Sequence, residues 1–181
     1  IIQSNTKHKV IITGTYGLAK YLSDYYGATN LKGIRSGTHL YYLELDDATN
    51  ADIFINCEHN GSQQVILFDR FFNLWKYKYK KYIINISSRA AQPNISKGFM
   101  YASEKAALNH YTNNTVYNSD KLCRVTTLNL GLMAHKTLPS VSYLDVLKTI
   151  NWLIHSTMEI PEITIQHRAN YQQVQYDKSH L

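Results

Sequence analysis

Residues 9–26, KVIITGTYGLAKYLSDYY, join a short β-branched run to a helical stretch through two glycines. The run Lys9–Thr13 predicts a buried strand, and the helical pattern continues to Tyr26. Gly14 and Gly17 lie between them, where glycine allows the tight turn that a strand–helix junction needs. This order of strand, glycine loop and helix indicates the first β–α unit of an open parallel sheet.

Six residues form the loop and the start of the helix: Gly14, Thr15, Tyr16, Gly17, Leu18 and Ala19. Such a loop suits a pyrophosphate, because glycines allow close approach and the helix start supplies N–H donors and a positive dipole. Ala19 occupies a third glycine position, where a small residue serves helix–strand packing. The loop therefore predicts a dinucleotide site, with an ordinary strand–helix turn as the alternative.

Strand and helix patterns alternate along the rest of the chain. Further strands are expected at Thr29–Ile34, His39–Leu45, Asp52–Asn56, Tyr82–Ser87, Arg124–Leu130 and Glu162–Gln166. Further helices are expected at Asn60–Tyr79, Gly98–Tyr117 and Leu144–Ser156. This alternation predicts an α/β fold, a doubly wound parallel sheet between two helical layers. Because the chain has 181 residues and neither repeat nor linker, we expect residues 1–181 to form a single domain.

Composition excludes several classes of protein. The apolar fraction is 44%, and no apolar run approaches the ~20 residues of a membrane span, so neither disorder nor membrane insertion is expected. Cys57 and Cys123 suit neither a disulfide framework nor a metal site, which favours a reducing compartment, the cytoplasm. The eight histidines form no i, i+4 pair, so no metal is expected. His59 and His135 are expected near the site, in surface or loop roles.

The formal net charge of +6 suits an anionic cofactor, a nucleic acid or a membrane surface. Its densest part is the run Lys76–Tyr82, in which lysines are interleaved with tyrosines. Stacking and phosphate contacts would make this run a nucleic-acid site. The run also lies between a helical pattern and a strand, where lysines complement the helix dipole. The second interpretation is favoured, and no nucleic-acid partner is expected.

The most informative stretch lies in the helical pattern 98–117. Tyr101 and Lys105 are spaced i, i+4 and so lie on one face of a helix. A phenol has a pKa of ~10, which makes it a poor acid–base at neutral pH. A neighbouring ammonium group stabilises the phenolate and brings this pKa toward the working range. Ser88, which follows the strand before this helix, adds a hydroxyl to the candidate site.

Together these motifs resemble the short-chain dehydrogenase/reductase family over nearly the whole chain. That family has a strand ending in a serine, then about a dozen residues, then Tyr-x-x-x-Lys followed by small residues. The matching segments here are Gly14–Gly17, Asn56–His59, Ser87-Ser88, Tyr101–Leu108 and Leu130-Gly131. The resemblance implies a Rossmann-type fold that binds a nicotinamide dinucleotide.

The resemblance also implies a reaction, hydride transfer between the nicotinamide and a small-molecule carbonyl or alcohol substrate. Tyr101 would exchange a proton with the substrate oxygen, and Ser88 would hydrogen-bond and position that oxygen. Lys105 would hold the nicotinamide ribose and lower the pKa of Tyr101. Asn60 lies near the spacing of the family's fourth catalytic residue and would hold a water in a proton relay to Lys105. A helix N-cap is an alternative or additional role for Asn60.

Cofactor preference depends on Arg35-Ser36, at the end of the second expected strand. An acid there would bind the ribose 2′-hydroxyl, whereas an arginine pairs with a 2′-phosphate, so NADP(H) is favoured over NAD(H). A surface arginine is the alternative. Asp46 or Asp47 is expected to border the adenine, and Asn56 and Gly131 complete the predicted cofactor-binding set.

Three connections are short for this family: Asp46–Ala51, the loop after Asn56 and Leu132–Pro139. Leu130 replaces a proline of the family, and His135 stands where a threonine often binds the nicotinamide carboxamide. The short loops favour an alternative, a dinucleotide-binding sensor or scaffold with little turnover. The four catalytic positions favour an enzyme, which is the leading prediction.

The expected helix Asn60–Tyr79 is apolar over more than one face, with Phe68, Phe71, Phe72, Leu74 and Trp75. A helix that is apolar nearly all round is usually buried on both sides. We therefore expect a homodimer or homotetramer that assembles through this helix and Gly98–Tyr117.

Overall fold

The computed structural model describes residues 8–31, 45–92 and 98–169. Its strands are β1 (Val10–Thr13), β2 (Thr29–Leu31), β3 (Ile53–Asn56), β4 (Tyr82–Ser88), β5 (Arg124–Leu130) and β6 (Glu162–Ile165). Its α-helices are α1 (Gly17–Tyr26), α2 (Leu45–Asn50), α3 (Gln63–Trp75), α4 (Phe99–Tyr117) and α5 (Tyr143–His155). A short 3₁₀ turn, η2 (Arg89–Ala91), follows β4.

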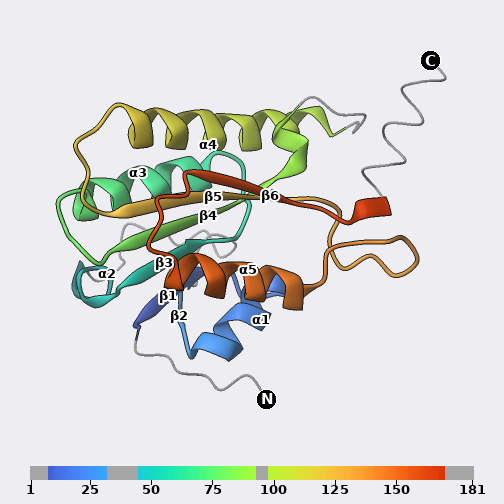
Figure 1. Ribbon diagram of the computed structural model, residues 1–181, viewed down its shortest axis with the longest axis horizontal. Helices are drawn as coiled ribbons and strands as arrows, with labels where there is room; N and C mark the ends of the chain where they lie inside the picture. Colours follow the sequence, from blue (N-terminus) through green and yellow to red (C-terminus); the bar gives the residue numbers. More distant parts are fainter. Residues whose placement is uncertain (1–7, 32–44, 93–97, 170–181) are drawn as a thin grey trace.

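The described strands form one parallel sheet in the order β2-β1-β3-β4-β5-β6. The chain leaves β1 toward one side of the sheet and returns to the other at β3, so the switch in strand order lies between β1 and β3. Helices α1 and α5 lie on one side of the sheet, and α3 and α4 on the other (Figure 1). The predicted doubly wound α/β fold is confirmed.

The alternation of side chains along each strand supplies the two apolar cores. In β3, Ile53 and Ile55 face the α1/α5 core, while Phe54 faces the α3 core. Phe54 stacks on Phe71 of α3, with ring centroids 3.7 Å apart. Burial on both faces is typical of parallel strands and explains their nearly continuous apolar sequence.

Beneath α4 the part of the sheet toward its carboxyl edge is polar. Asn85 of β4 donates a side-chain hydrogen bond to Thr112 (3.0 Å), and Ser87 donates to Asn109 Oδ1 (2.5 Å). The amide of Asn109 in turn donates to Asn129 Oδ1 of β5 (2.8 Å). All five side chains are buried. This set, here called the amide seam, fixes the position of α4 on the sheet, because each buried polar group needs its own partner.

Two expected elements have wrong boundaries, and the helix expected to run to Tyr79 also ends earlier, at Trp75. The third expected strand, His39–Leu45, lies outside the described residues up to position 44, and Leu45 begins α2 instead. The helix expected from Asn60 begins at Gln63, because Gly61 takes a left-handed φ of 53° that interrupts the helix. Asn60 therefore precedes the helix, and the N-cap role considered for it belongs by position to Ser62.

The apolar face that suggested assembly through α3 is buried within the chain. Phe68, Phe71, Phe72 and Trp75 all lie in the core, at exposed fractions of 6% or less. Their burial needs no second subunit. The homodimer or homotetramer stays a prediction, now without its main sequence argument.

Candidate active site at the carboxyl edge of the sheet

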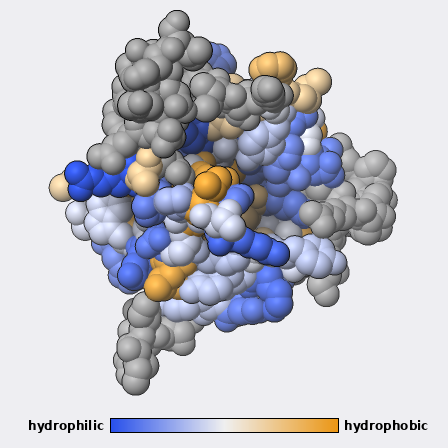
Figure 2. Space-filling view, turned by 90° about the vertical axis from the view of Figure 1, so that its right-hand side faces the viewer, coloured by the Kyte–Doolittle hydropathy of each residue, from blue (hydrophilic) through white to orange (hydrophobic). Residues whose placement is uncertain are grey.

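Four predicted site residues come from the carboxyl ends of neighbouring strands. Gly14 follows β1, Asn56 ends β3, Ser88 ends β4 and Gly131 follows β5. Parallel pairing brings these ends to one edge of the sheet, which is the face shown in Figure 2. Ligands of open α/β sheets bind at this edge, beside the switch in strand order.

The glycine loop has the conformation that its sequence requires. Gly14 has a φ of 98° and Gly17 a φ of 54°, and both values favour glycine. A Cβ on Gly14 would lie 3.0 Å from the Cβ atoms of Ala19 and Glu58, so the loop also needs glycine for packing. The hydroxyl of Tyr143 lies 3.2 Å from the Cβ position of Gly17, which brings an O–H group to the loop.

A threonine ties this loop's strand to the segment after β3. Thr13 Oγ1 accepts hydrogen bonds from the backbone N–H groups of Cys57 (2.7 Å) and Glu58 (2.9 Å). The threonine is fully buried, so these bonds are protected from water. The bonds hold residues 57 and 58 close to the end of β1, at the edge where the glycine loop begins.

Tyr101 and Lys105 lie on one face of α4, as their spacing requires. The Lys105 Nζ is 5.7 Å from the centroid of the Tyr101 ring. Tyr101 is 39% exposed, whereas Lys105 is 3% exposed. Burial lowers the pKa of Lys105 to about 8, although Cys57 and Glu104 act in the opposite direction. The pair joins an accessible phenol to a buried amine whose proton is held less firmly than usual.

The two serines at the end of β4 have different environments. Ser87 is buried and bonded to Asn109 in the amide seam. Ser88 is half-buried, and its Oγ accepts a hydrogen bond from the N–H of Ala90 (3.1 Å). Ser88 is therefore the serine at the strand end with access to solvent, as the predicted substrate-positioning role requires.

Lys105 is held by Gln64, a residue that sequence reasoning missed. Its Nζ donates to Gln64 Oε1 (2.6 Å) and to the carbonyl of Ile86 (2.9 Å). Asn60, predicted to act through Lys105, is exposed and lies before α3. An available signal was the position of Gln64, one turn before Phe68 on the buried side of α3, where a polar side chain needs a partner.

A histidine–glutamate pair adjoins the candidate tyrosine. His59 Nε2 lies 2.7 Å from Glu104 Oε2, and both side chains are partly exposed. The imidazole packs edge-to-face on Tyr101, with ring centroids 4.8 Å apart. The sequence placed His59 near the site in a surface or loop role, without this contact. The pair brings a proton-carrying ring and a carboxylate to the tyrosine.

The remaining predicted cofactor residues are only partly described. The amide of Asn56 donates to the carbonyl of Gln64 (2.8 Å) and to Asn85 (2.9 Å), so it links two strands and α3. Among the described residues its own Oδ1 has no partner. A Cβ on Gly131 would lie 2.7 Å from that of Gln166, so this glycine allows close packing with the chain after β6. Arg35-Ser36 lie outside the described residues, and the side chain of Asp46, in α2, is not described.

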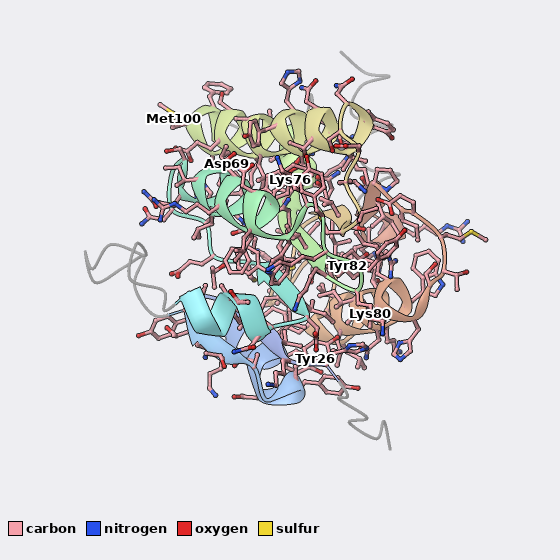
Figure 3. All side chains as sticks on the ribbon, turned by 90° about the vertical axis from the view of Figure 1, so that its left-hand side faces the viewer. Tyr26, Asp69, Lys76, Lys80, Tyr82 and Met100 are labelled. Atoms are coloured by element: carbon pink, nitrogen blue, oxygen red, sulfur yellow. The ribbon has the colours of Figure 1, made fainter. Side chains whose placement is uncertain are left out.

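The basic run lies at the other end of the sheet. Lys76 and Lys80 appear on the amino-terminal edge near Tyr82, the first residue of β4 (Figure 3). Lys81 is engaged locally, since its Nζ donates to the carbonyl of Ala51 and lies 5.5 Å from the Trp75 ring centroid. The run therefore cannot contact a ligand bound at the carboxyl edge.

Neither a metal cluster nor a membrane span is found in the described parts of the chain. No three His, Cys, Asp or Glu residues there form a group that could hold a metal ion. No described helix is both long and apolar enough to cross a membrane. Burial raises the pKa of the Cys57 thiol to about 12 and that of the Cys123 thiol to about 11, so both favour the protonated form.

The sequence matches no protein-family model, and no curated protein sequence matches it. Solved structures do resemble the fold. Serine dehydrogenase from Escherichia coli is 20% identical, with a TM-score of 0.64 over 90% of this chain and 88% of that one. A metagenomic short-chain oxidoreductase in complex with NADP is 14% identical, with a TM-score of 0.66 over 90% and 98%. 4-Hydroxyisoleucine dehydrogenase complexed with NADH is 15% identical, with a TM-score of 0.65 over 87% and 96%.

At these identities the likeness establishes the fold and leaves the activity open. The Rossmann-type fold implied by the sequence motifs is confirmed, and solved structures match it over about nine-tenths of the chain. The neighbours include complexes with both forms of the cofactor, so they do not distinguish NADP from NAD.

Proposed function

We propose that the protein is an NAD(P)-dependent oxidoreductase that transfers a hydride between the nicotinamide and a carbonyl or alcohol carbon. One observation carries the proposal. The accessible phenol of Tyr101 and the buried amine of Lys105 share one face of α4. Ser88 and the glycine loop lie at the same edge of the sheet.

The residues at this edge fit a dinucleotide. The backbone N–H groups at the start of α1 and the hydroxyl of Tyr143 would hold the pyrophosphate. Lys105 has one N–H beyond its two protein acceptors, and that N–H would hold the ribose. Glu58 packs against Gly14, and its negative charge would weaken the binding of phosphate by this loop. When bound, the nicotinamide supplies or accepts the hydride.

The side chains divide the proton chemistry among them. Tyr101 donates a proton to the substrate oxygen during reduction and accepts one during oxidation. Ser88 hydrogen-bonds the same oxygen and holds it against the phenol. Lys105, when protonated, stabilises the phenolate of Tyr101. His59 packs edge-to-face with the Tyr101 ring, and its hydrogen bond with Glu104 connects the tyrosine to a carboxylate.

NADP(H) is the proposed cofactor in preference to NAD(H), because Arg35 would pair with the 2′-phosphate. A charge-assisted contact of this kind contributes about 1.5–3 kcal/mol. NADPH should therefore bind more tightly than NADH in a calorimetric titration, and Arg35→Asp should reverse or abolish the difference. Equal affinities for the parent protein would contradict this preference.

Turnover by Tyr101→Phe tests the proposed reaction. The change keeps the ring and its contact with His59, so folding and NADPH affinity should remain nearly those of the parent. Turnover of an active substrate from a panel of aldehydes and ketones should fall by about 10² to 10⁴, the range for a lost general acid–base. Parental turnover in this variant would remove the tyrosine from the mechanism.

A dinucleotide-binding sensor is the second candidate. It is favoured by the burial of Lys105, since two of its N–H groups already bind protein oxygens and hold it 5.7 Å from the Tyr101 ring centroid. A protein that binds NADPH but turns over no member of a broad carbonyl and alcohol panel would be this sensor.

A further inference from the structure

Gln64 is at the centre of a buried hydrogen-bond network. Gln64 is 2% exposed, and its side chain extends from α3 to contact α4, β3 and β4. Its Nε2 donates to the backbone carbonyls of Asn56 (2.9 Å) and Ile86 (3.0 Å). Its Oε1 accepts from the Lys105 Nζ at 2.6 Å. All the usual capacity of the amide nitrogen is used, and both of its acceptors are backbone carbonyls of strands, at the end of β3 and within β4.

This network fixes which way the Gln64 amide faces. The two strand carbonyls can only accept, so they require the nitrogen side of the amide. The oxygen side must then face Lys105, whose ammonium can only donate. Exchanging the oxygen and nitrogen would set two donors against each other and two acceptors against each other. The sheet therefore aims an acceptor at the lysine.

The Ile86 carbonyl completes the arrangement around the lysine. It accepts from Gln64 Nε2 and from Lys105 Nζ (2.9 Å), and so joins the two side chains. Lys105 is left with one N–H, because an ammonium group has three. The strand register pairs Asn56 with Asn85, so the network spans adjacent strand ends.

We propose that Gln64 is the positioning residue for Lys105, which it holds at the strand ends with a single N–H directed to the dinucleotide ribose. The inference rests on the proposed function for the ribose contact alone. The hold on the lysine exists without any ligand. The contact is direct, from the Lys105 Nζ to a side-chain amide of α3.

The acid–base behaviour of Lys105 reports directly on this contact. Burial lowers the pKa of Lys105 to about 8, and its titratable neighbours are Cys57 after β3 and Tyr101 and Glu104 on its own helix. A hydrogen bond from the ammonium to Gln64 favours the charged form. Removing that acceptor should lower the pKa further, whereas a carboxylate in its place should raise it.

Two variants of the full chain separate these effects. Gln64→Met keeps the length of the side chain without its oxygen, and it should lower the Lys105 pKa by about 1 unit or more. Gln64→Glu keeps an oxygen beside the lysine and adds a charge, so it should raise this pKa. Both values are measured by NMR titration of ¹³C-labelled lysine side chains, with Lys105→Met identifying the signal.

Gln63 provides the matched control, because it is the neighbouring glutamine on α3 and is only half-buried. Gln63→Met and Gln63→Glu should leave the Lys105 signal almost unchanged. A purely structural role for Gln64 would destabilise both Gln64 variants without opposite shifts in the lysine titration. If Gln64→Met fails to fold, the upward shift in Gln64→Glu still decides the matter.

NADPH binding then tests the ribose contact. Gln64→Met should weaken NADPH binding by about tenfold, the effect of one lost hydrogen bond of ordinary strength. A Lys105 pKa that is unchanged in both Gln64 variants would overturn the proposal. Tighter NADPH binding by Gln64→Met would overturn it too, because Gln64 would then keep Lys105 away from the ribose. If the two Gln64 variants shift the Lys105 pKa in opposite directions but the parent protein binds no dinucleotide, the contact between Gln64 and Lys105 is supported. The proposed function is then overturned instead.

Discussion

Both faces of the sheet carry an apolar core, but only the α4 side adds a buried network of hydrogen-bonded side chains between helix and strands. On the α1/α5 side the contacts are mainly apolar, with Ile150 and Leu153 of α5 fully buried in the core. On the α4 side the amide seam connects β4 and β5 to the helix through hydrogen bonds. Apolar contacts tolerate small displacements, but hydrogen bonds between paired groups fix both distance and direction.

The difference follows the location of the candidate site. Tyr101 and Lys105 lie on α4, the helix attached through the seam. A catalytic phenol must be placed accurately, because small displacements reduce the rate strongly. We infer that the apolar cores mainly supply stability, while the amide seam supplies stability together with the position of the site.

The largest effect is expected from the α1/α5 core. Ile150→Ala removes a fully buried side chain from α5 and should lower the free energy of unfolding by about 2–5 kcal/mol. Urea denaturation measures this loss, and Trp152→Ala, at a 55% exposed position of the same helix, is the control. NADPH affinity per folded molecule should be unchanged. A clear loss of affinity in Ile150→Ala would contradict this division of roles between the apolar cores and the amide seam.

The next effect depends on pH and on Lys105. Its pKa of about 8 in the folded chain lies below the unfolded value of 10.5, so the unfolded chain binds more protons between these pH values. The free energy of unfolding therefore gains from this group as the pH rises through that window. Relative to Lys105→Met, the parent should gain about 2–3 kcal/mol from pH 8 to pH 10.5. If the difference in free energy of unfolding between the parent and Lys105→Met does not change with pH, the pKa of Lys105 is not lowered in the folded chain.

The smallest change in stability, and the most specific one, is expected from the amide seam. Asn109→Ala leaves the Ser87 hydroxyl without its acceptor and Asn129 Oδ1 without its donor. Buried polar groups without partners cost about 1–3 kcal/mol. Unlike Ile150→Ala, this variant should also lose NADPH affinity, because α4 shifts. Calorimetry under conditions where both variants are folded makes the comparison, and parental affinity in Asn109→Ala would refute the role of the seam.

The sequence predicted the parts of the molecule that depend on local pattern. β-branched runs indicated the strands, the glycines indicated the loop, and the i, i+4 spacing placed Tyr101 and Lys105 on one helix face. Each of these signals lies within a short segment. The third expected strand was wrong at Leu45, where the apolar first residue of a short helix resembles the end of a strand.

Contacts between distant segments could not be predicted in the same way. The amide seam consists of ordinary Asn, Ser and Thr residues, and only the register of β4 with β5 and α4 makes them partners. Gln64 lies 41 positions from Lys105, so spacing gave no reason to pair them. Asn60 had the expected spacing, but the left-handed Gly61 leaves it outside the helix. The oligomer prediction could not distinguish burial within one chain from burial between two.

The most direct test of the account is an NMR titration that maps where NADPH binds on the ¹⁵N-labelled parent protein. The carboxyl-edge site and the basic run lie at opposite ends of the sheet, so backbone amide shifts distinguish them (Figures 1 and 3). We predict that NADPH shifts the amide signals of residues 14–18 and 101–105, while those of residues 76–80 stay in place. Shifts confined to residues 76–80, or no shift in the glycine loop at saturating NADPH, would contradict the account.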